Sequence, residues 1–126
     1  DFRPDFDAAE SGMDVFINWK KDFVGKEAAL AAKEAGPSRK LVAMTIDVDG
    51  IDVSNDEAIL KDGAAVGYIS SGGYAHHAKA SMAMGYVSAE HAAAGTRLQV
   101  EILGEMYDAE VLGAPIYDAN GANMRA

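Results

Sequence analysis

The acidic residues between positions 47 and 57 are the first candidates for ligand chemistry, because carboxylates bind calcium. Five of them fall in this segment: Asp47, Asp49, Asp52, Asp56 and Glu57. A calcium loop of the EF-hand type needs its glycine at the sixth position, whereas Gly50 is the fourth residue counted from Asp47. The spacing therefore predicts a solvated acidic loop and no metal site.

A second group of candidates surrounds Gly72-Gly73. Paired glycines let backbone amides approach an anion, but phosphate loops of known type open directly into a helix. Here Tyr74-Ala75-His76-His77 follows instead, which predicts a glycine bend or bulge. His76 and His77 are adjacent, so on an extended segment they face opposite ways and cannot bind one metal together.

The serines near these histidines do not lie where a catalytic serine is found. A triad of the hydrolase type needs its serine on a strand–turn–helix elbow, close to a histidine and a carboxylate. None of the three candidates occupies such an elbow: Ser70, Ser71 and Ser81.

The terminal stretch from Pro115 to Arg125 is turn-rich and polar, as is typical of a surface tail. Such a tail can close over a neighbouring site, and here it would do so with Tyr117 and Arg125. Taken together, the residues contain no self-contained catalytic constellation, and we expect no catalytic residue in this chain.

The composition narrows the classes of partner. The 126 residues carry a formal charge of -9, which disfavours nucleic acid because nucleic acid needs a positive surface. There are no cysteines, which excludes disulfides and thiolate metal sites. No apolar run reaches the length of a membrane span. The chain starts at Asp1 without Met, so we expect a processed product or a piece of a longer protein.

The elements that must position these residues begin with a helix. Residues 26–35 are strong helix formers, and Gly36-Pro37 supplies a left-handed cap and a stop. Before it, the first 24 residues mix aromatic and acidic positions without a period. We expect an irregular lead-in there, with one short strand at Val15–Asn18.

After Pro37 the period changes to two, which predicts strands. The expected strands fall at residues 41–48, 57–60, 64–70, 81–87, 97–103 and 107–112, and a short helical turn is expected within residues 88–93. Lys61-Asp62-Gly63 predicts a hairpin. Met82, Met84 and Tyr86 fall on one face, and we interpret the two methionines as core. One helix followed by short antiparallel strands predicts a mostly β (α+β) chain whose main body is a small barrel or sandwich.

Seven motifs along the chain resemble those of the glycine cleavage system T-protein (aminomethyltransferase) family, in the family's order and spacing. They are Lys20–Ala28, Asp62-Gly63, Val66-Gly67-Tyr68, Ser71-Gly72-Gly73-Tyr74, Gly85-Tyr86-Val87, Val100–Glu105 and Pro115–Asp118. The stretches Phe16–Phe23 and Ser71–His77 are most similar to the bacterial dimethylglycine and sarcosine dehydrogenase branch. In Lys79-Ala80-Ser81 the lysine is one place earlier than in the family's Gly-Lys-Ser.

This resemblance implies a fold and a function. The implied fold is one helix followed by a small antiparallel six-stranded β-barrel like the aminomethyltransferase C-terminal barrel. Residues 1–36 would be the end of the folate-binding region plus a connecting helix, and residues 37–126 the barrel domain. The implied function is the C-terminal portion of a tetrahydrofolate-dependent aminomethyltransferase-like protein, whose catalytic aspartate lies upstream. This chain would contribute folate-binding walls, with Tyr117, Arg125 and Tyr74 as the candidates.

The resemblance also implies partners. The upstream folate-binding domain of the same protein would be the partner, and FAD would bind only in an upstream domain that this chain lacks. The location would be cytoplasmic in a bacterium and the mitochondrial matrix in a eukaryote. Two other readings stay open: a structural or docking barrel without a ligand, and an acidic interaction domain unrelated to folate.

Overall fold

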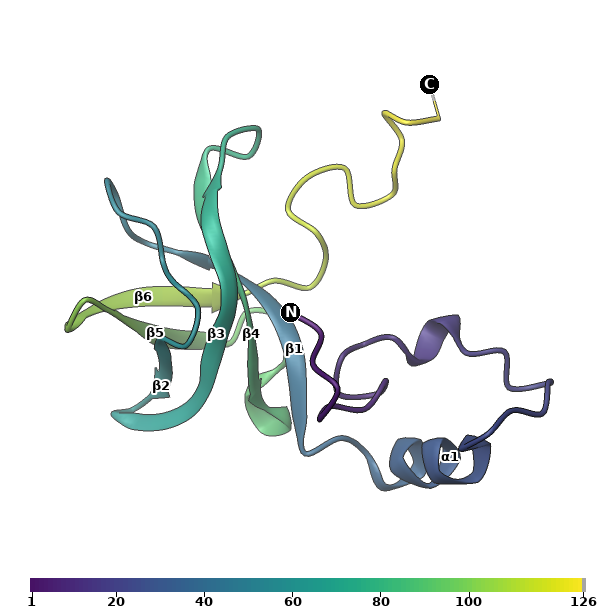
Figure 1. Cartoon of the computed structure of the whole chain (residues 1–126). Helices are drawn as coiled ribbons and strands as arrows, with labels where there is room; N and C mark the ends of the chain where they lie inside the picture. Colours follow the sequence, from purple (N-terminus) through teal and green to yellow (C-terminus); the bar gives the residue numbers. More distant parts are fainter. Residues whose placement is uncertain (126) are drawn as a thin grey trace.

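The computed structural model describes residues 1–125 and shows a barrel with an arm at one end and a tail after its last strand (Figure 1). The arm comprises residues 1–36 and contains helix α1 (Lys26–Ala35). The strands follow as β1 (Arg39–Ile46), β2 (Ala58–Lys61), β3 (Ala64–Ala75), β4 (Ala80–Ser88), β5 (Arg97–Ile102) and β6 (Glu105–Val111).

The six strands close into an antiparallel barrel in the order β1-β4-β3-β2-β5-β6. Closure leaves no open sheet edge. The expected fold class is therefore confirmed, and it is a barrel rather than a sandwich. The register of β3 against β4 shifts between Ile69 and Ser71. This irregularity lies just before Gly72, near the predicted glycine bend, and the strand then continues to Ala75.

The barrel interior is filled by side chains that alternate along the strands. Val42, Met44 and Ile46 of β1 face inward, as expected from the period of two. Leu98, Val100 and Ile102 of β5 complete the opposite wall, again as expected. Val48 lies past the end of β1 and packs against the core from outside the strand.

Tight turns join the strands where two successive residues have positive φ. Asp62 and Gly63, with φ of 50° and 81°, form the predicted hairpin between β2 and β3. Leu103 and Gly104, with φ of 52° and 87°, join β5 to β6. The expected helical turn is a 3-10 helix at Ala89–His91.

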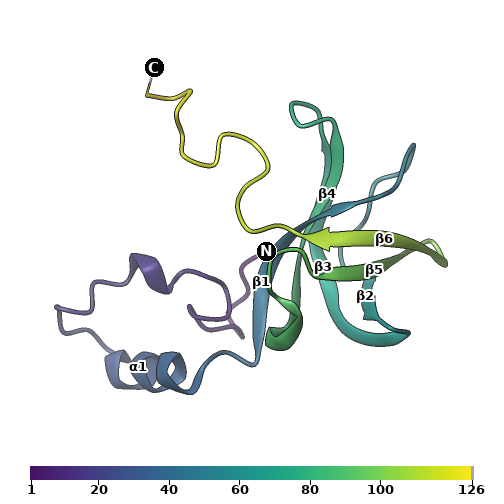
Figure 2. The same cartoon turned by 180° about the vertical axis from the view of Figure 1, so that it is seen from behind.

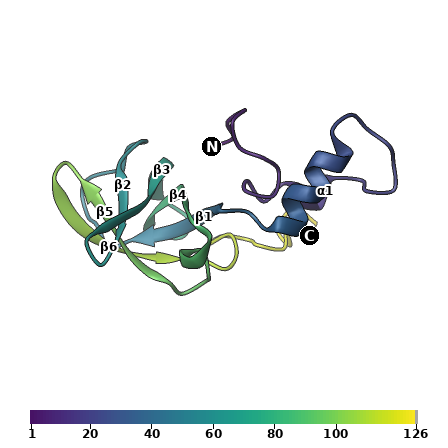
Figure 3. The same cartoon turned by 90° about the horizontal axis from the view of Figure 1, so that it is seen from below.

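The arm starts beside the barrel, and its later part with α1 extends away from it (Figures 1 and 3). Helix α1 has the predicted bounds, yet it contains no buried residue. The short strand expected at Val15–Asn18 was wrong, because Asp14–Phe16 form a 3-10 helix. No strand edge of the closed barrel is free to pair with this segment, and Phe16 is 80% exposed. None of the helices in residues 1–125 combines the length and apolarity that a membrane crossing requires.

Candidate functional site

The outer face of strands β1 and β4 is apolar, although the outer positions of a small barrel are commonly polar. Leu41 and Ala43 of β1 and Met82 and Met84 of β4 are half-buried on this face. On β5 and β6 the outer positions are mainly polar: Arg97, Gln99, Glu101, Asp108 and Glu110. The contrast marks the β1–β4 face as a surface that other atoms are meant to cover.

The interpretation of Met82 and Met84 as core was therefore wrong, although their shared face with Tyr86 is confirmed. The inward positions of β4 are held by small residues such as Ala83 and Gly85. A Cβ placed on Gly85 would lie 2.6 Å from the Tyr68 carbonyl oxygen and 2.8 Å from Ile59 Cδ1. The barrel has no room for a large side chain at this point, so the methionines lie outside.

A groove of about 690 Å³ lies on this apolar face. The barrel wall supplies Leu41, Ala43, Met82 and Met84, and the chain after β6 supplies the other wall with Leu112–Tyr117. The Leu112 amide donates a hydrogen bond to the Ala43 carbonyl oxygen at 2.8 Å, which ties the start of the tail to β1. The size and apolar lining are those of small-molecule sites, which run from about 300 to 1,000 Å³.

The tail beyond the groove is an ordered loop built around Asp118. The Asp118 carboxylate accepts hydrogen bonds from the amides of Ala122 at 2.7 Å and Asn123 at 3.1 Å. Its carbonyl oxygen accepts a third from the Gly121 amide at 2.8 Å. The Asn123 side-chain amide donates to the Tyr117 hydroxyl at 3.2 Å. The expected surface tail is thus a hydrogen-bonded loop attached to Tyr117, which leaves the barrel after β6 (Figure 2).

The three predicted folate-binding residues lie in different places. Tyr117 lines the groove, and its ring meets the His77 ring at 4.9 Å between centroids. Tyr74 lines a separate hollow of about 290 Å³ with Ser81 and the loop 49–52. Ser81 faces into the barrel whereas Met82 faces the groove, so Tyr74 and Tyr117 lie on opposite faces of the β3–β4 hairpin. Arg125 lies beside Gly121 in the tail and lines neither hollow.

The first residues of the arm cover the other half of the apolar face. Tyr86, on the same outer face as the methionines, is only 1% exposed. The Phe6 ring packs on it at 4.3 Å, and its hydroxyl donates to the Asp1 carbonyl oxygen at 3.1 Å. The side chains of Ser70 and Ser71 both donate to the Asp1 carboxylate at 2.6 Å. Arm and tail therefore flank the groove.

The sequence was not used to assign a site role to Tyr86 or Phe6, and His77 was considered only as a metal ligand or as a hydrogen-bonding group near a ligand. One signal was present: Met82, Met84 and Tyr86 alternate with Ala83 and Gly85. Small residues at the inward positions of a strand and large residues at its outward positions are typical of a narrow barrel whose outer face is covered. The contacts of Phe6 and His77 span many residues and left no local pattern.

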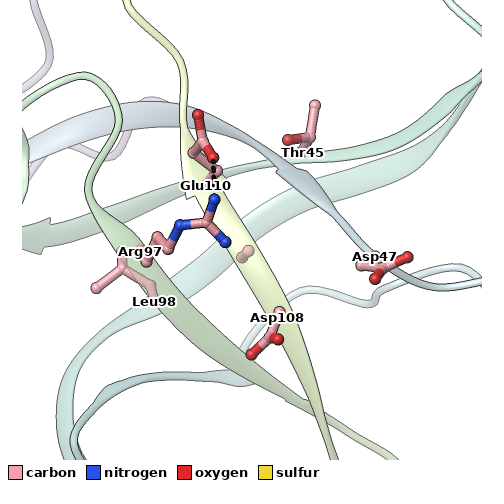
Figure 4. A pocket seen from close by; sticks show the side chains of 7 residues that line it. Thr45, Asp47, Arg97, Leu98, Asp108 and Glu110 are labelled. Carbon is pink, nitrogen blue, oxygen red and sulfur yellow. Dashed lines mark ion pairs between the residues drawn. The ribbon is translucent and has the colours of Figure 1, made fainter.

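Another hollow, of about 250 Å³, lies on the polar side of the barrel (Figure 4). Arg97 of β5 pairs with Glu110 of β6 at 3.6 Å, and Asp47 and Asp108 lie on the same side. Residues 1–125 hold no group of three or more His, Cys, Asp or Glu side chains placed to bind a metal ion. We therefore assign no ligand to this hollow.

One titratable group near the apolar face is perturbed. Burial raises the pKa of the Tyr68 hydroxyl above its usual value of 10.0, and the nearby Arg3 guanidinium opposes this effect. The Tyr68 hydroxyl oxygen is fully buried and has no hydrogen-bond partner among residues 1–125. Outside this region, the hydrogen bond from the Tyr107 hydroxyl to the Glu105 carboxylate raises the pKa of Tyr107.

The chain is similar to proteins of two kinds. It is 34% identical over 114 residues to the mitochondrial dimethylglycine dehydrogenase of Rattus norvegicus, covering 89% of this chain and 13% of that protein. It is 34% identical over 119 residues to an aminomethyltransferase of Desulfitobacterium hafniense, covering 94% of this chain and 32% of that protein. The chain thus spans a third or less of the length of these relatives.

A solved structure shares the fold. The glycine cleavage system aminomethyltransferase T from Bartonella henselae superposes with a TM-score of 0.82 at 24% identity, covering 92% of this chain and 33% of that chain. The family model described as the glycine cleavage T-protein C-terminal barrel domain matches residues 39–118. With a closed six-stranded barrel over the matched residues, the chain belongs to the glycine cleavage T-protein C-terminal barrel family.

Proposed function

We propose that this chain is the C-terminal portion of a tetrahydrofolate-dependent aminomethyltransferase-like protein from the dimethylglycine or sarcosine dehydrogenase branch. One observation supports this proposal: most of the chain, barrel included, is similar both to dimethylglycine dehydrogenases and to aminomethyltransferases. Both kinds of protein handle a one-carbon unit attached to an amine nitrogen. A barrel common to both is best explained by a step that they share, namely transfer of that carbon to folate.

The groove between barrel and tail is the part of this chain that fits a folate. Tetrahydrofolate, when bound, supplies the nitrogen that accepts the one-carbon unit. The half-buried Met82 and Met84 offer an adaptable apolar wall for a flat ring, and Tyr117 offers an aromatic face at the end of the groove. These residues would bind and exclude water, while the reacting groups would come from the upstream region.

Tyr74 and Arg125 lie farther from the groove than Tyr117, which lines it. Both would act from outside the groove, because neither lines it. Arg125 lies on the ordered loop attached to Tyr117, so it would meet a carboxylate of a ligand that extends past the tail. Both residues are proposed contacts to folate, and the variants Tyr74→Ala and Arg125→Ala test them separately.

We propose that residues 1–36 belong to the folate-binding region that precedes the barrel, and that 37–126 form the barrel domain. The later part of the arm supports this proposal, because α1 packs against residues of the arm, with Lys33 paired to Asp14 at 3.2 Å and lying over the Trp19 ring. Helix α1 nevertheless buries no residue, and a ten-residue helix gains most of its stability from burial of an apolar face. Val15 and Phe16 are 75% and 80% exposed, which suits a surface covered by an upstream domain.

The remaining parts of the proposal concern the whole protein. FAD would bind in an upstream domain and not in this chain. The protein would lie in the cytoplasm of a bacterium or in the mitochondrial matrix of a eukaryote; the dimethylglycine dehydrogenase of Rattus norvegicus is a mitochondrial protein.

The experiment is calorimetric titration of the 126-residue chain with folinic acid, repeated with Tyr117→Ala, Arg125→Ala and Tyr74→Ala. We expect binding near micromolar, about -8 kcal/mol, that weakens most in Tyr117→Ala. Phe16→Ala is the control, because this aromatic ring is 80% exposed on the arm and lies outside the groove. Absence of heat up to millimolar ligand would reject folate binding by this chain.

The alternative of a docking module is favoured by the unburied face of α1. It is tested by hydrogen exchange on the chain alone and on a longer protein that includes the preceding region. If the chain is a docking module, the amides of α1 become protected in the longer protein, and Tyr117→Ala leaves the affinity for folinic acid unchanged. If the chain is instead part of a folate-binding protein, the α1 amides become protected and Tyr117→Ala also weakens folinic acid binding.

A further inference from the structure

We propose that His77 is a positioning residue, which holds the C-terminal tail (residues 112–125) over the apolar groove by its contact with Tyr117. The consequence for folate rests on the proposed function, whereas the attachment of the tail to the barrel does not. His77 lies in the turn that joins β3 to β4, far in sequence from the tail that it contacts.

A backbone hydrogen bond and an aromatic ring pair connect the tail to the barrel on either side of residues 113–116. The first is the hydrogen bond from the Leu112 amide to the Ala43 carbonyl oxygen. From Gly113 to Tyr117 the described chain makes no further backbone hydrogen bond to the barrel. The next contact is the edge-to-face meeting of the Tyr117 and His77 rings, at 4.9 Å and an interplanar angle of 61°. Gly113 lies close to Ala94 at the start of the intervening wall, and the ring pair holds the other end of the wall.

Tyr117 connects His77 to the rest of the tail. Its hydroxyl accepts a hydrogen bond from the Asn123 side chain, and Asn123 is held in turn by the Asp118 carboxylate. The loop 118–123 is thus joined to Tyr117, and through the Tyr117 ring to His77. Release of Tyr117 from His77 would free the loop as a unit and open the groove along its outer wall.

The neighbouring His76 provides an internal comparison. It makes the same kind of contact as His77, but with Tyr74 on the other face of the hairpin, at 5.1 Å and 80°. Both histidines are exposed and lie in the same turn. A substitution at His76 therefore reproduces the local change in the turn without touching the tail.

The test compares His77→Ala, His77→Phe and His76→Ala in the full 126-residue chain. The first readout is the rate of chymotryptic cleavage after Tyr117, with the product identified by mass spectrometry. The second is hydrogen exchange of the Gly121, Ala122 and Asn123 amides. An aromatic edge-to-face pair is worth enough to raise both rates about 3- to 10-fold when it is lost. Phenylalanine retains the ring edge, so His77→Phe restores both rates, and His76→Ala leaves them at the wild-type value.

Two results would overturn the proposal. One is unchanged cleavage and exchange in His77→Ala at an unchanged urea midpoint, and the other is an equal increase in His76→Ala. Titration with folinic acid then separates the two proposals. Weaker binding in His77→Ala that His77→Phe restores supports both. A released tail with unchanged folinic acid affinity supports the attachment by His77 and contradicts the role of Tyr117 in folate binding.

Discussion

The hydroxyl oxygens of Tyr86 and Ser11 lie 2.9 Å apart, although 75 residues separate them in the chain. This hydrogen bond joins the arm to the outer face of β4. The Glu10 carbonyl oxygen adds a second link by accepting from the Leu41 amide on β1 at 2.8 Å. Arg39 reinforces both, because it pairs with the Glu10 carboxylate at 3.1 Å and lies over the Phe6 ring. The start of the arm is therefore part of the folded barrel, whereas α1 is not.

We predict that Tyr86→Phe lowers the free energy of unfolding by about 1 kcal/mol, because it removes the hydroxyl but keeps the ring that packs on Phe6. Urea denaturation checks the value. Tyr107→Phe is the control: its hydroxyl binds Glu105 on the surface, and the expected loss is below about 0.5 kcal/mol. Equal losses in the two variants would mean that the Tyr86 hydroxyl, through its hydrogen bonds to the arm, adds nothing to barrel stability.

We predict that two glycines of β3 respond oppositely to alanine. A Cβ on Gly67 would overlap the Tyr86 carbonyl oxygen of the neighbouring strand, whereas a Cβ on Gly73 meets no atom within 4 Å. Gly67→Ala should therefore destabilise the barrel by about 1–3 kcal/mol. Gly73→Ala should change stability by less than about 1 kcal/mol, with a small gain from reduced freedom of the unfolded chain. Urea midpoints decide, and similar losses at both positions would contradict the packing argument.

Local patterns predicted most of the elements. The helix former run before Gly36-Pro37 and the alternation in β1 and β5 were sufficient, because both reflect interactions within one element. The segment 15–18 was mispredicted because its exposed apolar residues resemble half of a strand pattern, while the strand it would pair with does not exist in a closed barrel. Pairing is a tertiary property that the segment alone does not encode.

The candidate site was predictable only in part. Tyr117 was predicted as a folate contact and lines the groove. Its contact with His77 and the division of Tyr74 and Tyr117 between two faces depend on the path of the tail. Met82 and Met84 were assigned to one face correctly and to the interior incorrectly. Periodicity gives the shared face of a strand, whereas which face is inside is set by the space that opposing strands leave.

We predict that ionisation of Tyr68 lowers the free energy of unfolding as the pH rises above about 10. Burial raises the pKa of Tyr68 in the folded state above 10.0, so the folded state holds this proton more tightly than the unfolded state. Its contribution is fully present below about pH 10 and is lost as the pH rises through the folded pKa. Urea unfolding at about pH 8 and about pH 11 should show a smaller difference in Tyr68→Phe than in the wild-type chain. A difference of equal size would show that Tyr68 does not contribute.

The two methionine environments give the last prediction. Met44 is fully buried inside the barrel, whereas Met84 lines the groove and is half-buried on the opposite side of the sheet. Met44→Ala leaves a cavity and should cost about 2–5 kcal/mol, while Met84→Ala widens a groove that is already open and should cost less than about 1.5 kcal/mol. The effect of the two substitutions on folinic acid affinity should have the opposite order. Folinic acid affinity should fall in Met84→Ala and stay unchanged in Met44→Ala measured below its unfolding midpoint, since only Met84 would touch the bound ring. A loss of affinity confined to Met44→Ala would place the binding surface inside the barrel and contradict the assignment of the groove.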